Sequence, residues 1–486
     1  MTSGVVHTER PAASASPPPG GPHSGSIRPR LAILTALVFA GTAAGLVIGS
    51  GAYAAPAEGI VDSGPVVAWL LPLFRALALA AGVATFGWLG YAAFIGAQRK
   101  GGLLGSGALR DMHRAGTAAG LWAVAALVAA TLSLANILGS PLAEAIRPEV
   151  ISKYAWDIPS VRAYVMAAFF AGAIWVGARY ARSLAGAAGW WVVALAALAF
   201  APLAGHAAGY GDHAMALTSG VAHTWASAAW AGGLLALAVH AWRGDPGVVQ
   251  AAGRYSNIAL VSVGFLALTG IGNAYTRMDT ISDLWNSGYG RLVVIKTVIL
   301  LILVGIAAVV RRNLAPKLGE SRRALVGLVG LELGLLAVAG GLAVALAQTP
   351  YPRAENSALT VAEQLLGQAM PAAPTTGTLI LGWQFEPFFL VGGVVAAALY
   401  IAGVMRLRAR GDSWHPGRTI SWLIGVSAII WATNSGMALY SQVSFSIHMF
   451  QHMLLSMIAP ILLVMGTPIT LALRALRPAP DGRRGP

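Results

Sequence analysis

Long apolar runs recur along almost the whole chain and are separated by short polar connections. Each run has roughly 20 residues or more, which is enough for an α-helix to cross a hydrocarbon core about 30 Å thick. We count twelve such runs, at approximately residues 31–50, 66–97, 115–139, 161–182, 187–206, 217–240, 257–275, 290–310, 323–347, 388–406, 418–437 and 444–466. The pattern therefore predicts an all-α, polytopic transmembrane bundle of about twelve spans.

The composition agrees with a membrane protein, because 57% of the 486 residues are hydrophobic and only 10% are charged. Soluble domains carry roughly 25% charged residues. Most of the 32 Lys and Arg residues fall in the two tails and in every second loop. Cytoplasmic loops carry such an excess, so we expect both termini to be cytoplasmic and the protein to span the plasma membrane several times. The formal charge of +14 then reflects topology, with membrane lipids and not nucleic acid as the surroundings.

The polar segments divide the chain into a tail, two modules and a linker. We expect a disordered cytoplasmic tail, a first transmembrane module, a proline-rich extracytoplasmic linker and a second transmembrane module at residues 1–30, 31–347, 348–385 and 386–486, respectively. The apolar run at 31–50 follows Arg28 and Arg30, as in a signal peptide. Its length exceeds that of a signal core, so we favour a retained helix.

The last predicted span begins with the sequence SIHMFQHMLLSM, which places His448 and His452 one helical turn apart. Met449 and Met453 form the neighbouring stripe. Imidazole and thioether donors together suit Cu(I) better than Mg²⁺, Ca²⁺ or Mn²⁺, and the chain has no cysteine. The alternative is that the histidines hydrogen-bond to neighbouring helices and the methionines are packing residues.

A second group of histidines is predicted at the same membrane face in the first module. His206 ends one span, His213 lies in the short outer connection, and His223 lies in the next span. Convergence of these rings would make a metal site. The alternative is that they anchor the helices at the membrane boundary, as interfacial polar and aromatic residues often do.

Other polar residues inside the spans are candidates for supporting roles. Lys296 and Glu332 are the charges nearest the membrane core, and we expect them to form an ion pair between adjacent helices, with a proton or cation relay as the alternative. Asn273 and Asn434 lie at the depth of the histidines and could orient an imidazole. Hydrolase, nucleotide-binding and metalloprotease motifs are absent from the sequence in any meaningful context, so we do not expect an enzyme.

Two parts of the chain resemble known membrane protein families. The first module resembles the CopD copper-resistance membrane domain over about residues 65–352, through HTWASAAWAGG, TGIGNAYTRM, WNSGYGRLVVIK and AQTPYP. From about Gln384 the chain resembles the start of the CtaG family of caa3-type cytochrome c oxidase assembly factors, through HMFQHMLLSMIAPILLVMGTP. The CtaG family continues through further histidine-bearing helices, whereas this sequence stops at Pro486, so the second module is expected to be truncated.

The resemblance implies a protein that binds copper at the outer face, for import or for delivery to cytochrome c oxidase during its assembly. Oxidase subunits and an extracytoplasmic copper chaperone are then the expected partners. Two alternatives stay open. A b-type cytochrome would use His206 and His223 as axial haem ligands, and a structural assembly chaperone would dock on oxidase subunits without holding metal.

Overall fold

The computed structural model describes most of the predicted spans. The described residues are 63–96, 102–203, 213–245, 247–278, 280–309, 322–347, 349, 352, 360–366 and 370–475. The predicted tail and the predicted span at 31–50 lie outside them. The described residues form helices and two isolated backbone bridges, which confirms the all-α prediction.

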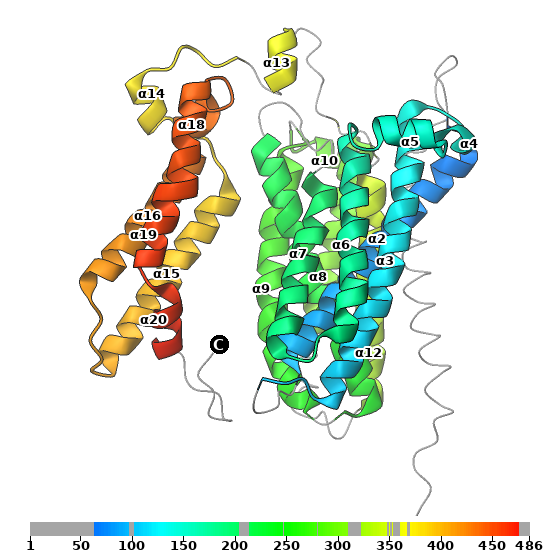
Figure 1. Ribbon diagram of the computed structural model, residues 1–486, viewed down its shortest axis with the longest axis horizontal. Helices are drawn as coiled ribbons and strands as arrows, with labels where there is room; N and C mark the ends of the chain where they lie inside the picture. The colour runs from blue at the N-terminus through cyan, green and yellow to red at the C-terminus, as the bar shows by residue number, and fades with distance from the viewer. Residues whose placement is uncertain are drawn as a thin grey trace, which may run out of the picture.

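Long helices of the first module lie side by side in one bundle (Figure 1). They are α2 (Pro65–Gly90), α3 (Ser106–Leu138), α6 (Pro159–Tyr180), α7 (Leu184–Leu203), α8 (His213–Arg243), α9 (Val248–Tyr275), α11 (Gly288–Val309) and α12 (Arg322–Leu346). A π-helical turn, η3 (Tyr91–Ile95), continues α2. Three short helices cap one end of the bundle, namely α4 (Leu142–Ala145), α5 (Pro148–Tyr154) and α10 (Asp283–Asn286).

The second module forms a smaller group of helices. It contains α15 (Pro387–Ala409), α16 (Pro416–Asn434), α17 (Gly436–Tyr440), α18 (Phe445–Met453), η6 (Leu454–Ile458), α19 (Ala459–Met465) and α20 (Pro468–Ala475). Within the predicted linker, α13 (Val361–Leu366) and α14 (Thr376–Leu381) lie at the same end of the molecule as α5 and α10 (Figure 1). This arrangement agrees with a linker on one side of the membrane.

Helix length and composition support a multi-pass membrane protein. Nine stretches within the described residues are long and apolar enough to cross a membrane. Two further expected spans, α8 and α16, are also helices of 31 and 19 residues, although they are not among those nine. The predicted count of twelve spans and the cytoplasmic placement of both termini stay predictions.

The bundle core is built around small residues that let helices approach closely. A Cβ atom added at Gly87 of α2 would lie 2.1 Å from the backbone oxygen of Gly232 on α8, so these two helices touch backbone to backbone. Alanine is the commonest residue of the same core, which also contains bulky side chains such as Trp88, Trp122 and Trp230. This tight contact fixes α8, which carries His223 and His240.

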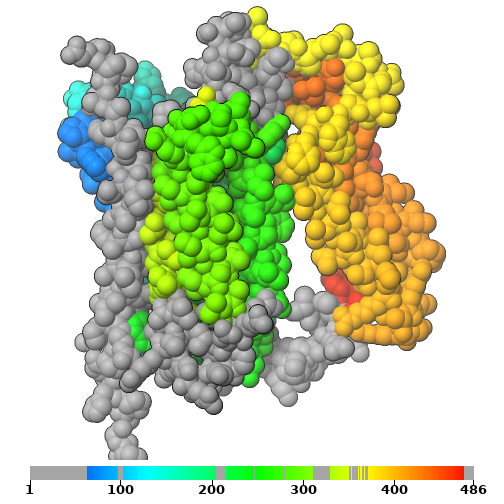
Figure 2. Space-filling model, turned by 180° about the vertical axis from the view of Figure 1, so that it is seen from behind, coloured from blue at the N-terminus to red at the C-terminus, as the bar shows by residue number. Residues whose placement is uncertain are grey.

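The two helix groups meet near the end that carries α13 and α14 (Figure 2). There, the hydroxyl of Thr218 on α8 donates a short hydrogen bond to Oε1 of Glu386, the residue before α15. Thr218 is early in α8 and Glu386 is the N-cap of α15, so the contact lies at the ends of both helices.

Candidate metal centre

His448 and His452 lie next to each other on α18, as their spacing predicts. Their ring centroids are 6.4 Å apart and the ring planes are inclined by 30°. Both histidines are exposed, and Met449 and Met453 are 37% and 46% exposed. The four side chains therefore form an open strip on the surface of the helix group, and other helices in the described part of the chain do not cover it.

The strip is held in place by its neighbours on α18. Nε2 of Gln451 donates a 2.7 Å hydrogen bond to the backbone oxygen of Ala432, which ties α18 to α16. Directly after Met453 the helix widens into the π-helical turn η6. Such turns occur often at functional sites, because they rotate the preceding side chains relative to the following ones.

Among the described residues, no group of three or more His, Asp or Glu side chains is arranged so that it could hold a metal ion. A Cu(I) ion at His448 and His452 would need its further donors from the adjacent methionine sulfurs or from a partner. The donor types fit Cu(I), since thioether and imidazole ligands are the ones this soft ion accepts.

The histidine group predicted in the first module is only partly described. His206 lies outside the described residues, and His213 is the first residue of α8, with its side chain outside the described part. His223 is half-buried, and its Nδ1 lies 2.9 Å from Oγ1 of Thr269 on α9. Convergence of the three rings therefore stays a prediction.

Two basic residues lie near His223. Lys296 on α11 and Arg277, just beyond the end of α9, are close enough to act on its ring electrostatically. Arg277 donates from Nη1 to Oδ1 of Asn273 at 2.8 Å and to its backbone oxygen at 2.9 Å. Among the described side chains, the partner of the Asn273 amide oxygen is thus a guanidinium. Two cations make this position less favourable for a metal cation than the α18 strip.

Glu332 makes a different contact from the expected one. Nε1 of Trp230 on α8 donates to Oε1 of Glu332 at 3.2 Å, and the glutamate is only 4% exposed. The ion pairs formed between described residues do not include Lys296 with Glu332. The carboxyl group therefore fastens α12 to α8 in the structure.

Asn434 has a backbone-supporting role. It is fully buried, and its Oδ1 accepts a 2.8 Å hydrogen bond from the backbone N–H of Glu386. Its Nδ2 donates to the backbone oxygen of Ile430 at 3.1 Å. The side-chain amide of Asn434 thereby fixes the start of α15. It makes no hydrogen bond to a histidine among the described residues.

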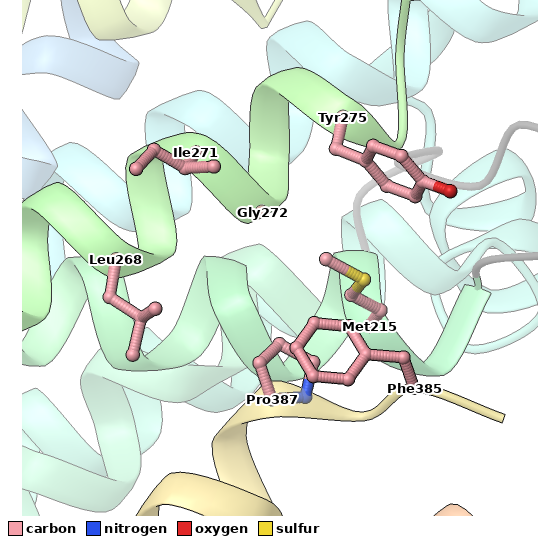
Figure 3. Close-up of a pocket in the computed structure, with 7 residues that line it drawn as sticks. All are labelled: Met215, Leu268, Ile271, Gly272, Tyr275, Phe385 and Pro387. Carbon is pink, nitrogen blue, oxygen red and sulfur yellow. The ribbon is translucent and has the colours of Figure 1, made fainter. Parts of the chain in front are cut away.

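A small cavity of about 170 Å³ lies where the two modules meet (Figure 3). Its lining is apolar and comes from α8, α9 and the start of α15. The lining residues are Met215, Leu268, Ile271, Gly272, Tyr275, Phe385 and Pro387. Met215 supplies the one sulfur atom of this lining, so the cavity by itself offers no set of metal ligands.

Sequence reasoning missed a buried polar group at the opposite end of the bundle. Asp111 on α3 and His240 on α8 are in direct contact, with Asp245 and Arg114 completing the group. The sequence places His240 near an inner end of a span, but it does not show that an aspartate from another helix lies opposite.

Comparisons with known proteins match both modules. Residues 249–346 match the model of the family Copper resistance protein D, and residues 398–485 match that of the Cytochrome c oxidase caa3 assembly factor. These matches confirm the predicted fusion of two family resemblances in one chain. They agree with a multi-pass membrane protein that has a copper-related role.

Uncharacterized proteins of three mycobacteria are similar to part of the chain. Those of Mycobacterium bovis and Mycobacterium tuberculosis are 43% identical over 132 residues, and that of Mycobacterium leprae is 38% identical over 133 residues. The aligned segment is 27% of this chain and 20% of each relative, so the chain spans about a fifth of the length of the curated relatives it matches. No solved structure matches the chain significantly.

Proposed function

We propose that the protein binds copper on the exposed α18 strip, formed by His448, Met449, His452 and Met453, at the outer membrane face. The strip serves copper import, delivery of copper to cytochrome c oxidase during assembly, or both. The observation that carries this proposal is the pair of neighbouring imidazoles on an open surface, within the segment that matches the oxidase assembly factor model.

An open site suits transfer of an ion between proteins. A buried and fully coordinated ion leaves slowly, whereas two or three donors on a surface leave a coordination position for a ligand of the receiving protein. An oxidase subunit or a copper chaperone could supply that ligand. The first module, part of which matches a copper-resistance family, would supply or receive the same ion. We take the two modules as residues 31–347 and 386–486, as the sequence predicts.

The test is metal analysis of the detergent-purified protein loaded with Cu(I) under reducing conditions. We expect about one ion per chain at the strip, lost in the double variant His448→Ala, His452→Ala. His113→Ala is the matched control, because His113 is an exposed histidine on α3 whose Nδ1 contacts only the backbone oxygen of Leu109. Unchanged copper binding in the double variant would refute the assignment.

The same variants separate copper binding from docking. The match of residues 398–485 to the oxidase assembly factor model favours docking on oxidase subunits as the second candidate function. If the double variant loses copper and still supports oxidase assembly in cells, the docking function stands without metal. A Soret absorption band in the purified protein would instead establish haem.

A further inference from the structure

One imidazole bridges two carboxylates at the end of the first module opposite α5 and α10. Nε2 of His240, in the last turn of α8, lies 3.0 Å from Oδ2 and 3.1 Å from Oδ1 of Asp111 on α3. Nδ1 of the same ring lies 2.7 Å from Oδ2 of Asp245, two residues beyond α8. Both ring nitrogens therefore face carboxylate oxygens.

These contacts require two protons. An ionised carboxylate only accepts hydrogen bonds, and a neutral imidazole has one N–H and one lone pair. Two hydrogen bonds need either a doubly protonated ring between two carboxylates or a neutral ring with one protonated carboxyl group. If one of these protons is lost, a ring lone pair faces a carboxylate oxygen at 3.1 Å or less, and this contact is repulsive in a buried site.

The surrounding groups balance the charge. Nη1 of Arg114 donates to Oδ1 of Asp111 at 2.7 Å, and its guanidinium lies 4.8 Å from the centre of the Trp88 ring. The Tyr91 ring of η3 stacks on His240 with centroids 4.1 Å apart and an angle of 6° between planes. The other charged groups that act on this cluster are Arg110 of α3 and Arg254 of α9.

Arg254 of α9 contacts the C-terminal end of η3. Its Nη1 donates to the backbone oxygens of Ile95 and Gly96, both at 3.0 Å. The π-helical turn that holds the Tyr91 ring against His240 is thereby fixed from α9. Elements α2 with η3, α3 and α8 thus meet at the His240 ring, and α9 holds η3 in place.

Exposure falls in one direction along the cluster. The side chain of Asp245 is 25% exposed, that of His240 is 6% exposed and that of Asp111 is 2% exposed. Asp245 therefore connects the buried pair to water, while Tyr91 and Trp88 close the other sides.

We propose that Asp245, His240 and Asp111 form a proton-binding relay, which exchanges a proton with water at the inner end of the bundle and locks α3 to α8 while two protons are bound. When one proton leaves, a ring nitrogen and a carboxylate repel each other, and the end of α8 is released from α3. The ligand of this site is a proton, and the proposal does not depend on copper binding at α18.

The decisive measurement is nitrogen NMR of the detergent-solubilised full chain labelled with ¹⁵N-histidine. The His240 signal is assigned by its loss in His240→Gln, and His113→Gln is the control, since His113 is exposed on α3. We expect both ring nitrogens of His240 to carry protons at neutral pH. A neutral ring also supports the relay if infrared spectroscopy detects a carboxylic acid band that is lost in Asp111→Asn or Asp245→Asn.

Acid–base titration gives a second readout. Each asparagine variant should bind about one proton fewer per chain than the wild type across the titration of the cluster. Asp245→Asn keeps the buried contact between Asp111 and His240, so it stays informative if Asp111→Asn does not fold. A neutral His240 ring together with two ionised carboxylates at neutral pH would overturn the proposal.

Discussion

Thr218 of α8 and Glu386 at the start of α15 are joined by a hydrogen bond from the threonine hydroxyl to the glutamate carboxylate. The other carboxylate oxygen accepts from the backbone N–H of Phe389 at 2.9 Å, in the first turn of α15. One side chain thus caps a helix of the second module and holds it to the first module. The carboxyl group is only 5% exposed, so this contact should respond to protonation.

Burial raises the pKa of Glu386 above its usual value, and the hydrogen bonds from Phe389 and Thr218 only partly offset this effect. A carboxyl group with a raised pKa binds protons more tightly in the folded state than in the unfolded state. Its stabilising contribution is therefore greatest below the ordinary carboxyl pKa and is lost as the pH rises through the raised pKa.

The free energy of unfolding of the detergent-solubilised protein should fall as the pH rises from the ordinary carboxyl pKa to the raised pKa of Glu386. In Glu386→Gln this pH-dependent component should disappear, because the amide has no charge to bury. Glu149→Gln is the control, since Glu149 is an exposed residue of α5. Equal pH profiles for the wild type and Glu386→Gln would contradict the prediction.

Asn434 should contribute substantially to stability. Asn434→Ala removes the acceptor of the Glu386 N–H and leaves this buried donor without a partner, at a cost of about 1–3 kcal/mol. Hydrogen exchange of amides at the start of α15 should rise, and the thermal midpoint should fall. Asn257→Ala, an exposed position on α9, is the control and should have little effect. A similar small effect of Asn434→Ala would show that the start of α15 is held by other contacts.

The sequence predicted what lies along one helix better than what lies between helices. The spacing of His448 and His452 predicts neighbouring rings because i and i+4 positions share a helix face. In the structure the two rings are neighbours on α18. The exposure of that face was not predictable, because it depends on which helices cover α18.

Contacts between helices depend on packing that the apolar pattern does not encode. Trp230 and Glu332 are 102 residues apart, and Asp111 and His240 are 129 apart. Lys296 and Glu332 were expected to pair because they are the two charges at similar depth on neighbouring spans. The carboxylate of Glu332 instead accepts from the indole N–H of Trp230. The close packing of α8 in the bundle core places this indole next to Glu332.

The methionines of the α18 strip should select for a soft ion. Replacing Met449 and Met453 with leucine removes the thioether sulfurs while keeping apolar volume similar. Cu(I) affinity should fall by about tenfold or more, equal to about 1.4 kcal/mol, whereas Zn²⁺ binding at the imidazoles should change little. Competition titrations with a Cu(I) chelator measure the first quantity. Equal losses of affinity for Cu(I) and for Zn²⁺ would indicate a packing role for the methionines.

The backbone contact between α2 and α8 should tolerate no side chain. A Cβ atom at Gly232 would lie 2.4 Å from the backbone oxygen of Val83 and 2.9 Å from Cα of Gly87, and backbone atoms of a packed helix cannot move aside cheaply. Gly232→Ala should therefore push α8 from α2 and destabilise the bundle by about 1–3 kcal/mol.

Thermal unfolding in detergent measures this loss. The matched control is Gly253→Ala on α9, where an added Cβ would meet no atom within 4 Å, so helix propensity alone should stabilise the variant by up to about 1 kcal/mol. Because α8 carries His240, Gly232→Ala should also weaken the contact of its ring with Asp111, and the ¹⁵N signal of His240 should shift. Equal unfolding midpoints for Gly232→Ala and Gly253→Ala would mean that the helices separate without cost, contrary to the close contact at Gly87.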